Sequence, residues 1–145
     1  PCLHIPLVIS YPPLTATAGT NDQFALNIDI APTIMDLAGL EIPSSVDGQS
    51  LLPLLENPSV EWRNGFMIEH YQDAGDSEES GLANIIPSYS GFRTTEWKYI
   101  EYASGERELY DLINDPYEMN NLIDVPGYEE TILSLQSQLK ELKSP

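Results

Sequence analysis

Three strand-like segments that follow one another closely limit the fold of this chain more than any other feature. They are rich in aromatic and β-branched residues, and they lie at Tyr89–Thr94, Trp97–Ala103 and Glu106–Leu112. Thr95-Glu96 forms the first connection, and Ser104-Gly105 is a two-residue hairpin loop whose glycine supplies a positive φ. Hairpin loops join antiparallel strands, so this part of the chain is predicted to form a meander.

A fourth strand and a terminal helix complete this part of the fold. Gly65–Tyr71 alternates between two faces with the period of two that a strand has. Asn114-Asp115-Pro116 ends the sheet, because proline cannot donate a hydrogen bond to a neighbouring strand. Between Pro126 and Lys143, one apolar stripe repeats at helical spacing, at Tyr128, Ile132, Leu135, Leu139 and Leu142. We expect an α+β fold, with a small four-stranded antiparallel sheet packed by the C-terminal helix.

The first part of the chain has a different pattern. Ile5–Ser10 is a continuous apolar run that is typical of a buried strand, and prolines follow it. Asn27–Leu40 is predicted to be a helix that packs into the core, and Asp29 is its expected N-cap, accepting from the free first-turn amides. Gly39 is placed to stop this helix. We therefore divide the chain into two parts. Residues 1–60 hold a strand, a helix and a short helical turn, and residues 61–145 hold the sheet and the terminal helix.

Polar residues after the last strand are predicted to form turns. Asp115 is expected to accept hydrogen bonds from backbone amides, and Asn120-Asn121 has turn chemistry of the same kind. Glu118 is expected to close this asparagine-rich turn. Trp97 and Lys98 are expected to pack at the edge of the sheet, with the lysine stem lying along apolar surface.

The charge balance excludes some classes of partner. The 145 residues include 23 acidic and 6 basic ones, which gives a net charge of -17. Binding to nucleic acid requires a basic patch that displaces counterions, so this charge argues against nucleic acid. An anionic membrane surface is disfavoured for the same reason. No apolar run approaches the ~18 residues of a membrane span.

Metal-ligating patterns are absent from the sequence. Cys2 is the single cysteine, so it has no partner for an internal disulfide or for a zinc cluster. The segment from Gln72 to Ser88 carries several carboxylates, but it lacks the ladder and terminal glutamate of an EF-hand. We interpret that segment as a solvated acidic loop and expect no metal site in this chain.

Four segments resemble, in order and spacing, the C-terminal part of the type I sulfatases, the arylsulfatase-like branch of the alkaline-phosphatase superfamily. They read HIPLVISYP, NIDIAPTIMDLAGLEIPSSVDGQSLLPLL, EWRNGFMIEH and FRTTEWKYIEYASGERELYDLINDPYEMNNL. The last segment is the most specific, and the resemblance runs from about Ile5 to Leu142. It implies that the first strand and helix belong to a larger α/β sulfatase domain, which is the expected partner of this chain. The chain lacks an initiator methionine, and we expect it to be a fragment of the longer enzyme.

The resemblance also implies where the chemistry lies. Sulfatases of this family hydrolyse sulfate esters with a formylglycine, made in a C/S-x-P-x-R motif, and with a Ca²⁺ ion held by Asp and Asn residues. Cys2 is followed by Leu-His-Ile, and no motif of the family's metal ligands occurs in this sequence. We therefore expect no catalytic, cofactor-binding or metal-binding residue here, with formylglycine and Ca²⁺ in the missing N-terminal part. The chain alone is expected to be inactive.

Two residues are candidates for contact with substrate at the rim of the site. His70 ends a strand just before the acidic loop, and its alternative role is that of a structural histidine. Arg93 is a candidate for a sulfate contact, and its alternative role is as the partner of a buried carboxylate or carbonyl within the sheet. In a fragment, the run Ile5–Ile9 and the helix face of Ile30, Ile34 and Leu37 are expected to be partly exposed.

Two other functions stay open at this point. One is a related superfamily hydrolase that acts on phosphate or phosphonate esters, which would differ from a sulfatase in its nucleophile and metals upstream. The other is a non-catalytic module that binds glycans or another partner. The family resemblance alone favours an extracytoplasmic compartment, whether periplasmic, secreted or lysosomal.

Overall fold

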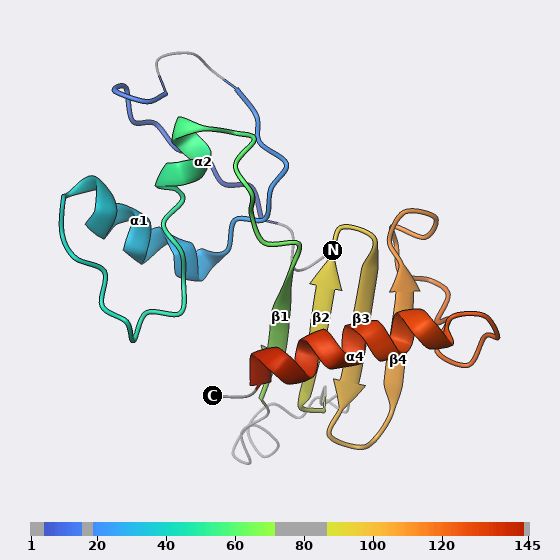
Figure 1. Ribbon diagram of the computed structural model, residues 1–145. Coiled ribbons are helices and arrows are strands. Elements are labelled where there is room, and N and C mark those ends of the chain that lie inside the picture. The colour runs from blue at the N-terminus through green and yellow to red at the C-terminus, as the bar shows by residue number, and fades with distance from the viewer. Residues whose placement is uncertain (1–4, 16–18, 72–86, 144–145) are drawn as a thin grey trace, which may run out of the picture. The chain divides into compact units, whose positions relative to one another are not determined.

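The structure divides into two compact units. The computed structural model describes residues 5–15, 19–71 and 87–143 (Figure 1). The units meet in the sequence between Arg63 and Asn64. The first unit holds a 3-10 turn and two helices: η1 (Asn27–Asp29), α1 (Ile30–Leu37) and α2 (Leu52–Glu56). The second unit holds four strands and one helix: β1 (Gly65–His70), β2 (Tyr89–Thr94), β3 (Trp97–Tyr102), β4 (Arg107–Asp111) and α4 (Glu129–Lys143).

The four strands of the second unit form the predicted antiparallel meander. Their order in the sheet is β1-β2-β3-β4, so each strand pairs with its neighbour in sequence. The register pairs Met67 with Phe92, Phe92 with Tyr99, and Tyr99 with Leu109. Gly105 has a φ of 95° in the hairpin loop, as its place in the sequence predicted. The prediction of an α+β fold with this sheet is confirmed.

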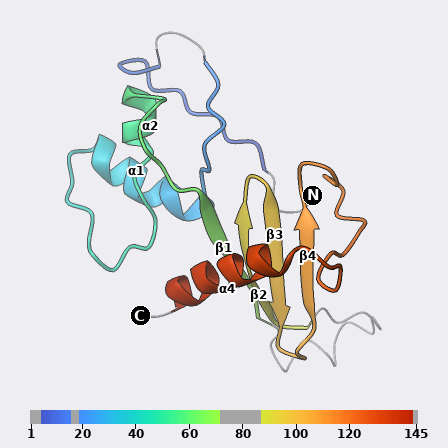
Figure 2. The ribbon, with the colours of Figure 1, turned by 45° about the vertical axis from the view of Figure 1, so that its right-hand side comes forward.

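Helix α4 crosses one face of the sheet, which we call the helix face (Figures 1 and 2). Its apolar stripe packs there, because Leu135 and Leu139 form one buried cluster with Phe92, Tyr99 and Leu109. Partly buried residues surround this cluster, including Met67, Trp97, Leu122, Ile123, Tyr128 and Ile132. The predicted terminal helix is thus confirmed, although it begins at Glu129 rather than Pro126.

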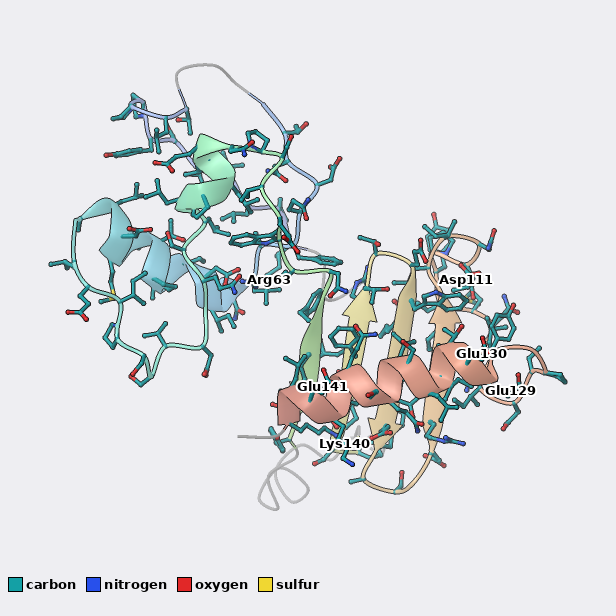
Figure 3. All side chains as sticks on the ribbon, viewed as in Figure 1. Arg63, Asp111, Glu129, Glu130, Lys140 and Glu141 are labelled. Atoms are coloured by element: carbon teal, nitrogen blue, oxygen red, sulfur yellow. The ribbon has the colours of Figure 1, made fainter. Side chains whose placement is uncertain are left out.

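Polar contacts fix the position of α4 in addition to this apolar packing. The buried hydroxyl of Tyr99 donates to Glu101 Oε1 at 2.9 Å and accepts from Gln136 Nε2 at 2.8 Å. Figure 3 shows Glu129 and Glu130 at the start of the helix and Lys140 in its last turns, where their charges complement the helix dipole.

The free edge of β4 is covered by the chain that follows it. Leu109 N–H donates to Asn121 Oδ1 at 3.0 Å, and Leu122 N–H donates to the Leu109 carbonyl at 2.8 Å. Asp115 Oδ2 accepts from the amides of Met119 and Asn120, each at 2.7 Å. The turn chemistry predicted for Asp115 and for the asparagine pair is therefore confirmed, and it protects an edge that would otherwise invite pairing with another chain.

In the first unit, the prediction of a strand at Ile5–Ser10 is wrong. The described residues of this run form no regular structure, and Val8 is 90% exposed. An apolar run forms a buried strand only where strands on both sides accept its backbone hydrogen bonds. No described segment pairs with this run, so the apolar pattern alone does not produce a strand.

The helix predicted in the first unit is present but shorter than expected, and the role assigned to Asp29 is wrong. Asp29 stands at the N-cap position of α1, but its side chain makes no capping bond to the helix. It accepts instead from the amides of Leu26 and Gln49, at 2.8 and 2.9 Å, and from Arg63 Nη2 at 2.9 Å. Arg63 compensates the charge of this fully buried carboxylate. The bond from Leu26 N–H belongs to a capping box at the start of η1, so Asp29 acts one element earlier than predicted.

The expectation that the apolar face of this helix is partly exposed is confirmed. Ile34 is 62% exposed and Ile30 is also exposed, whereas Pro32 and Thr33 on the same helix are buried. Thr33 Oγ1 donates to the Asp29 carbonyl and accepts from Leu51 N–H at 2.8 Å, which ties α1 to the residues before α2. The core of this unit therefore lies under Thr33, and the face of Ile30 and Ile34 stays open in this chain.

A glycine in the middle of β2 provides a test of how closely the strands of the sheet in the second unit pack. A Cβ atom at Gly91 would overlap the Tyr99 carbonyl oxygen and lie 3.2 Å from Ile68 Cγ1. We expect Gly91→Ala to destabilise the protein by roughly 1–3 kcal/mol, the usual cost of overpacking. Urea denaturation followed by circular dichroism measures this change. Gly19→Ala is the matched control, because nothing lies within 4 Å of the added Cβ, and equal stabilities of the two variants would contradict the packing described.

Candidate functional site

The two candidate residues from the sequence lie on the face of the sheet that points away from α4. Side chains alternate between faces along each strand, so the neighbours of Met67, Phe92, Tyr99 and Leu109 point to the opposite side. We call this side the second face. It carries Phe66, Ile68 and His70 of β1, Tyr89, Gly91 and Arg93 of β2, Lys98, Ile100 and Tyr102 of β3, and Glu108 and Tyr110 of β4.

His70 and Arg93 share the second face but do not form one contact site. The register pairs His70 with Tyr89 and Arg93 with Phe66, so four residues separate the two positions along the strands. At the usual rise of a strand, this separation is about 13 Å. One small sulfate group cannot contact both side chains, although a substrate of several sugar units spans such a distance.

His70 lies in a row of aromatic rings at one end of the second face. Its ring centroid is 5.5 Å from that of Tyr89, and the two planes are inclined by 33°. Tyr89 in turn packs edge-on against Tyr102, with centroids 5.6 Å apart. These distances lie within the range of favourable aromatic pairs. Tyr89 therefore packs against one side of the His70 ring. The residue is only half-buried, so part of its surface stays accessible.

Arg93 and Lys98 converge on the carboxylate of Glu118. Lys98 Nζ forms a short ion pair with Glu118 Oε2, and Arg93 Nη1 lies 3.8 Å from Oε1. The three side chains are 14%, 25% and 12% exposed in the order Lys98, Arg93, Glu118, so the cluster is largely buried. Two cations and one anion leave it with a formal charge of +1, within a chain of net charge -17.

This cluster corrects two expectations from the sequence. Glu118 does not close the asparagine-rich turn with its side chain. It points to the sheet instead, with a positive φ of 58° that is uncommon for a residue other than glycine. Lys98 does not lie at a sheet edge, because β3 is an interior strand. Arg93 does have the carboxylate partner that was one of its two expected roles, and the other role stays a prediction.

Sequence patterns identified part of the second face. The alternation of the strands puts Tyr89 and Tyr102 on the same face as Arg93 and Lys98, once the hairpin register is known. Glu118 was missed because it reaches the sheet from a turn, and no periodic pattern connects it to Lys98, 20 residues away. Tyr110 was also missed, although its ring lies under the Lys98 ammonium at 5.8 Å.

The described residues do not fit a calcium site or a sulfatase nucleophile. No group of three or more His, Cys, Asp or Glu side chains in residues 5–15, 19–71 and 87–143 is arranged to hold a metal ion. The buried carboxylate of Asp29 is already occupied by Arg63 and two amides. Cys2 and most of the acidic loop from Gln72 to Ser88 lie outside the described residues. No helix in the described part of the chain is long and apolar enough to cross a membrane.

Glu118→Gln tests the ion cluster of the second face. Glutamine preserves the shape of the side chain but leaves Lys98 and Arg93 without a counter-charge in a largely buried place. We expect a loss of about 3 kcal/mol in the free energy of unfolding, as when one partner of a buried pair is removed. Urea denaturation at pH 7 measures it. Glu130→Gln, at an exposed position of α4, is the control, and a loss no larger than that of the control would contradict a buried cluster.

The pKa of Tyr110 predicts how stability depends on alkaline pH. Burial, then the nearby charge of Glu108, raises its pKa from 10.0 to about 12. The unfolded phenol ionises near 10 while the folded one keeps its proton. The resulting stabilisation is complete below pH 10 and is lost as the pH rises towards 12. We expect Tyr110→Phe to flatten the decline in urea stability between pH 9 and 12. Tyr117→Phe, at an exposed position, serves as control, and identical declines in both variants and wild type would refute the assignment.

Comparisons with known proteins agree with the resemblance in the sequence. A family model described as N-sulphoglucosamine sulphohydrolase, C-terminal, matches residues 1–145. An N-acetylglucosamine-6-O-sulfatase of Bacteroides thetaiotaomicron is 33% identical over an alignment of length 145, gaps included. The alignment covers 97% of this chain and 25% of the relative. Arylsulfatase K of Homo sapiens is 31% identical over 142 residues, which cover 96% of this chain and 25% of the relative. The chain thus spans about a quarter of the length of the curated relatives it matches.

Solved structures match the fold as well. A structure in complex with its substrate, D-glucosamine-2-N,6-O-disulfate, has a TM-score of 0.73 and 31% identity, covering 84% of this chain and 24% of that one. The phosphonate monoester hydrolase of Agrobacterium radiobacter has a TM-score of 0.65 and 31% identity, covering 79% and 24%. The second match supports a place in the alkaline-phosphatase superfamily. The chain therefore belongs to the sulfatase family, and it corresponds to the C-terminal region that the N-sulphoglucosamine sulphohydrolase model describes.

Proposed function

We propose that this chain is the C-terminal portion of a sulfatase that hydrolyses sulfate esters of a carbohydrate. The observation that carries the proposal is the family match over residues 1–145, which spans both units rather than one shared motif. Relatives named for activity on N-acetylglucosamine 6-O-sulfate and on ulvan support a sulfated carbohydrate as the substrate. In this proposal, the chain provides scaffold and substrate contacts, and the reacting groups come from residues upstream.

The proposal assigns the cofactors to the upstream part. In type I sulfatases, formylglycine supplies the nucleophile and Ca²⁺ neutralises the charge of the sulfate oxygens. The 145 residues contain no C/S-x-P-x-R motif, and the described ones contain no metal-binding group. These two observations leave both groups to the N-terminal domain, which is the proposed partner of this chain.

Exposed apolar residues of the first unit support such a partner. Ile5, Leu7, Val8, Ile28, Ile30, Ile34 and Leu40 are all exposed. The first unit contains a single basic residue, Arg63, which neutralises the buried Asp29. Its remaining surface is therefore both apolar and acidic. Exposed large apolar side chains favour contact with another protein surface over solvent, and we assign that contact to the N-terminal sulfatase domain.

His70 and Arg93 are the proposed substrate contacts of this chain. Both lie on the second face, and Arg93 belongs to a cluster with a formal charge of +1. A sulfated sugar is anionic, so this cluster is a favourable place for it in an otherwise acidic chain. His70, at the other end of the face, is a hydrogen-bonding group for sugar hydroxyls rather than for the reacting sulfate.

The match to a phosphonate monoester hydrolase leaves one alternative function, the hydrolysis of phosphonate esters, for the experiment to test. Of the two classes, the relatives favour a sulfatase, since the curated matches quoted above are sulfatases. The decisive experiment uses the longer protein, in which this chain follows its own upstream residues. Release of sulfate from a 6-O-sulfated N-acetylglucosamine is compared with hydrolysis of an aryl phosphonate monoester, with and without a Ca²⁺ chelator.

We expect calcium-dependent sulfate release that exceeds phosphonate hydrolysis by at least about 100-fold, the size of effect that one misplaced charge-stabilising group has on catalysis. Arg93→Ala in the same protein should raise KM for the sulfated sugar more than it lowers kcat, because a rim residue contributes binding rather than chemistry. Arg107→Ala, at an exposed position of β4, is the matched control. Faster phosphonate hydrolysis would contradict the sulfatase assignment in favour of the alternative.

A further inference from the structure

The aromatic row at one end of the second face has no role in the function argued so far, apart from His70. The register places His70, Tyr89 and Tyr102 side by side on three neighbouring strands. The centroids are 5.5 and 5.6 Å apart, so the three rings form a continuous surface that crosses β1, β2 and β3. Elsewhere on this face one row holds no ring, and another holds Phe66 and Tyr110 on its two edge strands, so only this row places three rings on adjacent strands.

This row differs from the aromatic residues of the helix face. Phe92 and Tyr99 on the helix face are 3% and 0% exposed, and α4 covers them. His70, Tyr89 and Tyr102 are only half-buried. The rings pack against one another sideways and keep part of their surface accessible. Their arrangement resembles a binding surface more than a core, since tyrosines are enriched where an apolar body must end in a hydrogen-bonding group.

The polar groups around the row suit a neutral, hydroxyl-rich ligand. Burial raises the pKa of Tyr102, and its hydrogen bond with Glu108 raises it further, so the phenol is protonated at neutral pH. His70 adds a ring nitrogen at the other end of the row. The row thus presents apolar ring surface bordered by hydrogen-bond donors and acceptors. A pyranose ring has the complementary design, with C–H groups on its faces and hydroxyl groups around its rim.

The position of the row relative to the charged cluster indicates how such a ligand lies. Four residues along each strand separate the row from Phe66 and from the Arg93–Lys98 pair, and the row of Ile68, Gly91 and Ile100 lies between them. Ile68 and Ile100 are 8% and 4% exposed and fill the space over Gly91, where an added Cβ would lie 3.2 Å from Ile68 Cγ1. An anionic oligosaccharide with a sugar ring on the row would pass over these two side chains to bring a charged group towards Arg93.

We infer that His70, Tyr89 and Tyr102 form a sugar-binding platform that contacts a pyranose ring of the sulfated substrate remote from the scissile ester. This inference rests on the proposed function and adds to it the residues that select carbohydrate over simpler sulfate esters. The platform contributes binding energy only for substrates that carry the additional ring, so small aryl sulfates do not sense it.

The test compares two substrates in the longer protein that contains this chain. The variants Tyr89→Leu and Tyr102→Leu remove the rings but preserve apolar bulk, and Tyr89→Phe and Tyr102→Phe keep the rings. Each variant is assayed with a sulfated glucosamine-containing oligosaccharide and with 4-nitrophenyl sulfate. Tyr117→Leu is the matched control, because Tyr117 lies outside the sheet and is 79% exposed. Melting temperatures are recorded for every variant.

We expect each leucine variant to raise KM for the oligosaccharide roughly tenfold, the effect of losing one aromatic contact at a binding surface. The same variants should leave kcat/KM for 4-nitrophenyl sulfate within twofold of wild type, and the phenylalanine variants should retain most of the oligosaccharide affinity. An unchanged KM for the oligosaccharide overturns the inference. Equal losses on both substrates also overturn it, because the row then supports the fold or a contact between domains. A wild-type protein that hydrolyses neither substrate contradicts the proposed function itself.

Discussion

The packing of α4 on the sheet is the interaction on which the second unit depends. Leu135 and Leu139 contact the buried rings and side chains of β2, β3 and β4, and burial of each such side chain contributes about 1.5–3 kcal/mol. This packing commits one face of each strand to the core. Because side chains alternate, it also fixes which residues point the other way. The assignment of His70, Arg93 and the tyrosines to one common face is thus a consequence of where the helix lies.

The two faces of the sheet differ in character, since one packs against α4 and the other carries the largely buried ion cluster. The helix face packs apolar side chains against α4, and a polar network there joins Tyr99, Glu101 and Gln136. The second face carries charge, because Arg93 and Lys98 are there, balanced in part by Glu118. An acidic chain repels anionic ligands over most of its surface. Two of the six basic residues lie in this cluster, which under the proposed function is where an anionic sugar would approach.

The sequence was sufficient to predict the elements whose pattern is local. The meander, the hairpin at Ser104-Gly105 and the amphipathic α4 all follow from periodicity and turn chemistry within a short window. The predictions that were wrong concern residues whose partners are distant in sequence. Asp29 is bound by Arg63 instead of capping a helix, and Glu118 reaches Lys98 from a turn. Ile5–Ser10 has the composition of a strand but no described neighbour to pair with. Pairing depends on tertiary structure, which no local pattern encodes.

We propose that this chain supports a sulfatase site without containing its reacting groups. The most direct measurement is the rate of sulfate release from an aryl sulfate by the purified 145-residue chain in the presence of Ca²⁺, beside the longer protein under the same conditions. We predict no release above the uncatalysed rate for the chain alone and calcium-dependent turnover for the longer protein. Calcium-dependent hydrolysis by the isolated chain would contradict this account, because it would require a nucleophile and a metal site within these residues.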